Sequence, residues 1–61
     1  MTEERLQWAI DLYNELSGSE LQLVRNDWNW SLIADWWSVI ADGDLEHIYR
    51  VLLLEARDLL N

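Results

Sequence analysis

The single histidine, His47, lies close to two carboxylates, Asp44 and Glu46. This is the only arrangement in the sequence that resembles a general base with an orienting acid. Asp44 follows Gly43 and has the position of a helix N-cap, and Glu46 falls in a first turn, where a carboxylate suits the helix dipole. The candidate nucleophiles Ser31 and Ser38 have no histidine at helical spacing. We therefore expect no catalytic residues, and we expect that the protein is not an enzyme.

Metal and cofactor sites are also not predicted. The segment from Asp42 to Glu46 faintly resembles a calcium loop, but it lacks the spaced ligands and the distant bidentate glutamate of such a loop. The sequence has no cysteine and one histidine, which argues against a zinc site. It also has no glycine-rich phosphate loop. We expect neither a metal nor a cofactor.

The charge of the chain restricts its partners. Twelve Asp and Glu residues stand against four Lys and Arg residues, for a formal net charge of −8. All four basic residues are arginine. Nucleic acid and anionic membrane would repel such a surface, so we expect direct binding to neither. The complementary partner is another protein with a basic face. The simpler alternative is that the acidity serves solubility.

The elements that would position these side chains are predicted to be helices. Glycines at Gly18 and Gly43 divide the chain into three blocks. Thr2 is a good N-cap for a first helix over about 3–17, which Gly18 would end. Asp44 is a good N-cap for a last helix over about 45–60.

The middle block is open to two interpretations. Its start, Ser19-Glu20-Leu21-Gln22, has the pattern of a capping box, which predicts a short helix over about 19–25 and a further helix over 28–41. The alternation of apolar residues around Asn26-Asp27 also fits a hairpin. We reject the hairpin because Asn-Asp lacks the glycine of a tight primed turn and a lone two-stranded ribbon is marginal. The predicted fold class is therefore all-α: one domain over 1–61, a bundle of three helices, or four with the short second one.

Five tryptophans in 61 residues raise the question of what covers them. Any single one fits a small aromatic core, but a helix over 28–41 would be apolar around most of its circumference. We therefore predict a homodimer or a foreign protein partner, because aromatic residues are enriched at the energetic centres of interfaces. The predicted interface residues are Trp8, Trp28, Trp30, Trp36, Trp37, Val51 and Leu54.

The acidic residues form the second predicted surface. Glu4, Asp11 and Glu15 fall on one stripe of the first helix, and Asp35 and Asp42 on a narrow strip of the predicted middle helix. Our hypothesis is a small helical interaction module, an inhibitor whose acidic face imitates nucleic acid and occupies the basic groove of a partner. The alternative is a homodimeric helical scaffold without mimicry. The sequence shows no signal peptide and no apolar run of membrane length, so we expect a cytoplasmic protein.

Overall fold

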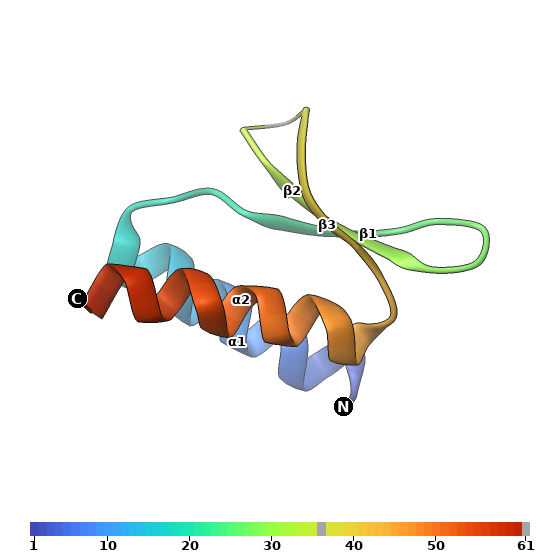
Figure 1. The fold of residues 1–61 in the computed structure, drawn as a ribbon, viewed down its shortest axis with the longest axis horizontal. Helices are drawn as coiled ribbons and strands as arrows, with labels where there is room; N and C mark the ends of the chain where they lie inside the picture. Colours follow the sequence, from blue (N-terminus) through green and yellow to red (C-terminus); the bar gives the residue numbers. More distant parts are fainter. Residues whose placement is uncertain (36, 61) are drawn as a thin grey trace.

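The computed structural model describes residues 1–35 and 37–60 of the chain. The elements follow in the order α1 (Glu3–Ser17), β1 (Gln22–Arg25), β2 (Trp30–Ala34), β3 (Ser38–Gly43) and α2 (Leu45–Leu60). The strands form one antiparallel sheet in the order β1-β2-β3, and both helices lie on the same side of it (Figure 1). The fold is therefore α+β, and the prediction of an all-α helical bundle is wrong.

The two helices begin and end at residues suited to those positions. The Thr2 hydroxyl accepts a hydrogen bond from the Arg5 amide (3.2 Å), and Gly18 ends α1 in the left-handed conformation at φ 72°. The Asp44 carboxylate accepts one from the His47 amide (2.8 Å) at the start of α2. These side chains satisfy amides that the first turn of a helix leaves without a partner.

The middle of the chain is a sheet, so the helices predicted over 19–25 and 28–41 are wrong. The capping-box pattern was misleading because a side chain of α1 holds the segment that follows Ser19. The Asn14 carboxamide accepts a hydrogen bond from the Leu21 amide (2.8 Å) and donates one to the Leu21 carbonyl (3.0 Å). Both backbone groups of Leu21 are thereby bonded as they would be to a neighbouring strand, and β1 begins at the next residue.

The hairpin that we rejected from the sequence is present. Its loop covers four residues, 26–29, and is closed by a hydrogen bond from the Asn26 amide to the Asn29 carbonyl (2.7 Å). A loop of this length does not need the glycine of a two-residue primed turn. The ribbon is also not alone, because β3 pairs with the other edge of β2. Both reasons for rejecting the hairpin therefore fail.

A second hairpin joins β2 to β3. Ala34 is paired with Ser38, and the Trp37 amide donates to the Ala34 carbonyl (3.3 Å). Asp35 has φ 53° in this turn, a left-handed conformation that aspartate tolerates better than most residues. The register shifts by one residue after Leu32, which is a β-bulge. Figure 1 shows this hairpin projecting away from the helices.

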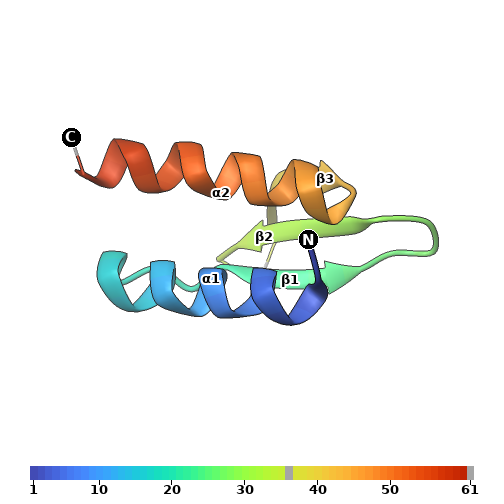
Figure 2. The ribbon, with the colours of Figure 1, turned by 90° about the horizontal axis from the view of Figure 1, so that it is seen from below.

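The core lies between the helices and the sheet. The two helices run in the same direction, and their N-terminal ends are neighbours (Figure 2). An ion pair between the α-amino group of Met1 and Glu46 (3.2 Å) joins these ends. The buried apolar side chains come from both layers: Leu6, Ile10, Leu21, Leu32, Ala41, Ile48 and Leu52. This small core leaves the outer face of the sheet and the outer side of the helices exposed.

Candidate interaction surfaces

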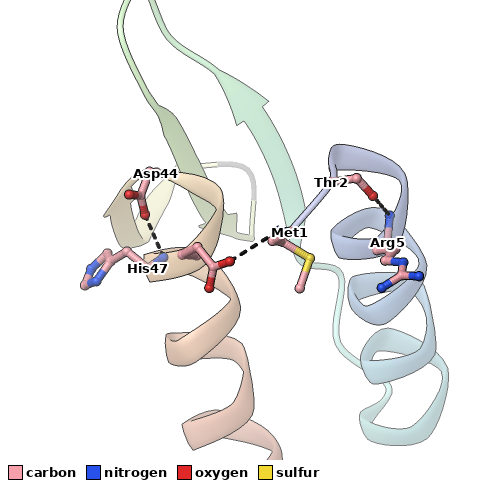
Figure 3. Close-up of polar contacts among 6 residues, drawn as sticks. Met1, Thr2, Arg5, Asp44 and His47 are labelled. Carbon is pink, nitrogen blue, oxygen red and sulfur yellow. Dashed lines mark hydrogen bonds and ion pairs between the residues drawn. The ribbon is translucent and has the colours of Figure 1, made fainter.

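The carboxylates near His47 are engaged in other contacts. Asp44 caps α2 through the backbone amide of His47, and Glu46 pairs with the α-amino group of Met1 (Figure 3). These contacts of both carboxylates belong to the helix ends and do not orient the imidazole. His47 itself is exposed on α2, with its ring against Gly43. This arrangement gives the two carboxylates a structural role at the helix ends.

A polar cluster lies on the outer face of the sheet. Ser31 is buried, and its hydroxyl accepts a hydrogen bond from the Asn26 amide nitrogen (2.6 Å) and donates one to Asp42 (3.2 Å). The same Asn26 nitrogen lies 3.4 Å from the Asp42 carboxylate. The three side chains come from the first hairpin loop, β2 and β3. Their mutual hydrogen bonds tie the loop to the sheet, which accounts for a buried polar side chain at this position.

Metal-binding clusters and membrane-spanning helices are both absent from residues 1–35 and 37–60. No group of three His, Cys, Asp or Glu side chains in these ranges could hold a metal ion. Neither helix is long and apolar enough to cross a membrane.

The predicted interface residues separate into different surroundings. Trp30 is half-buried on β2 and packs against the core, and the Arg25 guanidinium lies over its ring, 5.6 Å from the centroid. Val51 also packs against the core. Trp8 is exposed on α1 and Leu54 on α2. Trp36 lies outside the described residues.

The two remaining tryptophans are almost fully exposed on the hairpins. Trp28 in the first loop is 93% exposed, and Trp37 in the second turn is 83% exposed. Because their elements are strands and turns, they cannot form part of the predicted dimer interface on a middle helix. That helical interface does not exist, and what replaces it is a pair of hairpin ends that each present a large aromatic ring.

The outer face of the sheet connects these two ends. Side chains alternate between the faces of a strand, and Leu32 and Ala41 point toward the helices. The opposite face therefore carries Val24, Ile33 and Val39, of which Val24 and Val39 are exposed. Neither helix covers this face (Figure 1). We call it, together with Trp28 and Trp37, the sheet face.

The predicted acidic residues also fall into two groups. Glu4, Asp11 and Glu15 are exposed along α1, as the stripe requires. Asp35 lies in the turn after β2 and Asp42 on β3, so the polar strip of a middle helix does not exist. Asp35 and Asp42 therefore lie on the same hairpins as the residues of the sheet face. Asp27 does so too, because it precedes Trp28 in the first loop.

A second apolar surface lies between the two helices. A groove of about 220 Å³ runs along them, and its lining includes Trp8, Leu12, Leu16, Leu53, Ala56 and Leu60. Taking about 100° per residue, the charged residues on the same side are Arg5 and Glu15 of α1, and Glu46, Arg50 and Arg57 of α2. We call these lining and charged residues together the helical face.

The sequence pattern missed this groove because it gave the tryptophan-rich segment the role of the interface. The signal was present in α1, where Trp8 and Leu12 extend the apolar arc beyond what the core needs.

Comparison of the chain with protein-family models, with curated proteins and with solved structures finds no significant match.

Proposed function

We propose that the protein is a protein-binding module whose sheet face contacts a partner with a basic, apolar-lined surface. The observation that carries this proposal is the exposure of Trp28 and Trp37 at the two ends of an uncovered sheet face. Tryptophan loses much water-exposed apolar area on binding and is enriched at the centres of interfaces. Scattered exposed aliphatics are ordinary, whereas two exposed indoles on the hairpins of one sheet, with Val24 and Val39 exposed on its strands, favour a binding surface.

The charge around the sheet face supports a basic partner. Asp27 and Asp35 lie within two residues of the exposed tryptophans, and Asp42 lies on β3. Arg25 is the nearby arginine, and its guanidinium lies over Trp30. Carboxylates around an apolar centre steer a positively charged surface toward it and select against acidic partners. A cytoplasmic location is part of this proposal, and fractionation of cells that express a tagged chain tests it.

The test is retention of host proteins by the tagged full chain. We expect Trp28→Ala with Trp37→Ala to lose a protein that the wild type retains, because the two indoles supply the apolar contact. Trp8→Ala is the matched control, since it removes an exposed indole from the other layer. If no retained protein depends on Trp28 and Trp37, or if Trp8→Ala loses the same protein, the proposal is wrong.

The chemistry of the partner surface is tested in the same assay. Asp27→Lys with Asp35→Lys should weaken retention, and the wild-type interaction should weaken with salt, because exposed charges are screened beyond about 8 Å at physiological ionic strength. Added duplex DNA that displaces the retained protein would identify the partner surface as a nucleic-acid groove, as the mimicry hypothesis expects. If duplex DNA does not displace the retained protein even at low salt, the mimicry hypothesis is wrong. The partner then has a basic surface that is not a nucleic-acid groove.

A further inference from the structure

The helical face differs in charge from the rest of the molecule. It carries three of the four arginines, Arg5, Arg50 and Arg57, but only two of the twelve acidic residues, Glu15 and Glu46. All of the negative net charge therefore lies on other surfaces. Those other surfaces repel a second copy of this acidic chain. The helical face carries no net negative charge, so two helical faces can approach each other without this repulsion.

The helical face is also the side of the helical layer on which large apolar side chains remain exposed together. Trp8 is 67% exposed, and Leu12, Leu16, Leu53 and Leu60 are exposed around the same groove. A groove lined almost entirely by apolar side chains is stabilised when another apolar surface replaces water in it. The groove therefore supplies an apolar centre, and the arginines and glutamates supply a charged rim.

The charges on the rim are sorted by helix. Glu15 lies on the outer shoulder of α1, with Glu4 and Asp11 next to it just outside the helical face, whereas Arg50 and Arg57 lie on the outer shoulder of α2. The helices run in the same direction from neighbouring ends (Figure 2). Glu15 and Arg57 lie the same number of residues beyond their caps, Thr2 and Asp44.

We propose that two copies of the chain form a homodimer through their helical faces, with the two-fold axis parallel to the helices. This operation lays α1 of one copy on α2 of the other. Glu15 then faces Arg57 of the second copy, and each such contact occurs twice. Arg50 of the second copy comes level with Trp8, where a guanidinium can lie over the indole and near Glu4.

The other two-fold orientation, with its axis across the helices, is disfavoured by the same charges. It would place the acidic shoulder of α1 against its own copy, and the arginines of α2 against arginines. The pairing of α1 with α2 is therefore the arrangement that gives both arginines of α2 an acidic counterpart.

The proposal is tested by sedimentation equilibrium of the full chain, with neighbouring leucines as the matched pair. Leu53 lines the groove and is 49% exposed, and Leu54 is 61% exposed but lies away from it. We expect Leu53→Glu to abolish the dimer and Leu54→Glu to leave it unchanged. The helical circular dichroism of each variant confirms that it is folded.

A charge exchange tests the orientation and does not alter the core. Arg57→Glu should raise the dimer dissociation constant at least about tenfold, because it places two carboxylates together at each contact. Adding Glu15→Arg to this variant should restore the wild-type value. A wild-type chain that remains monomeric at every concentration, equal effects of Leu53→Glu and Leu54→Glu, or no rescue by the second exchange would overturn the proposal. Retention of partners through Trp28 and Trp37 is unaffected by these outcomes.

Discussion

At the scale of single residues, Asn14 ties the end of α1 to the start of the sheet. Its side chain bonds to both backbone groups of Leu21, which is buried at the base of the first strand. This contact was not predictable from the sequence, because it depends on the approach of two residues separated by the end of α1. The caps at Thr2 and Asp44, by contrast, were predictable because each bonds an amide three residues away.

We expect Asn14→Leu to destabilise the fold by about 2 kcal/mol, because the Leu21 amide and carbonyl would both lose their partner while remaining shielded from water. Urea unfolding followed by circular dichroism measures this change. Asn14→Asp keeps the acceptor for the Leu21 amide but loses the donor for the Leu21 carbonyl. Its free energy of unfolding should therefore lie between that of the wild type and that of Asn14→Leu. Unchanged unfolding midpoints for both variants would show that the two hydrogen bonds contribute nothing.

At the scale of elements, the ends of the chain were predictable and its middle was not. The spacing of apolar residues and the capping residues locate α1 and α2, because helix signals are local. As a helix, the middle segment would be apolar around most of its circumference. Strands with one face on the core and one half-exposed face have the same apolar composition. Its alternation was visible, but whether a ribbon is stable depends on a third strand and on helices that pack against it.

Gly18 gives a prediction at this scale, since it separates α1 from the sheet. Its φ of 72° is unfavourable for a side chain with a β-carbon, although no atom within 4 Å would collide with one. Gly18→Ala should therefore destabilise the protein by about 1 kcal/mol through backbone conformation alone. Gly18→Asn should cost less, because asparagine is the next most frequent residue at this position. Thermal unfolding of the two variants decides this; an alanine variant as stable as the wild type would contradict the prediction.

At the scale of the whole molecule, a single layer of helices leaves two surfaces uncovered. Of the residues predicted for an interface, Trp28 and Trp37 are exposed, whereas Trp30 and Val51 pack against the core; their role in binding stays a prediction. Composition predicted that a chain this small would leave apolar residues exposed. It could not assign them to two separate faces, because that assignment follows from the layer arrangement.

The net charge of −8 gives a prediction for the whole molecule. Folding confines this charge within a radius of gyration of 10.7 Å, which increases its self-repulsion relative to the unfolded chain. Raising sodium chloride from about 0.01 M to about 1 M shortens the screening length from about 30 Å to about 3 Å. We expect the thermal unfolding temperature to rise over this range in samples dilute enough to be monomeric. A constant or falling temperature would show that repulsion is not a significant cost.

The sequential strand order also bears on how fast the protein reaches its native state. Each strand pairs with the next one along the chain, and β1 and α2 directly follow the elements they pack against. Among the described elements, only the packing of α1 against α2 closes a loop that contains the whole sheet. Most native contacts thus form between near neighbours in the sequence, a topology associated with rapid folding, and without proline no slow isomerisation interrupts it. The docking of α2 onto α1 is then the step that carries most of the loop-closure entropy.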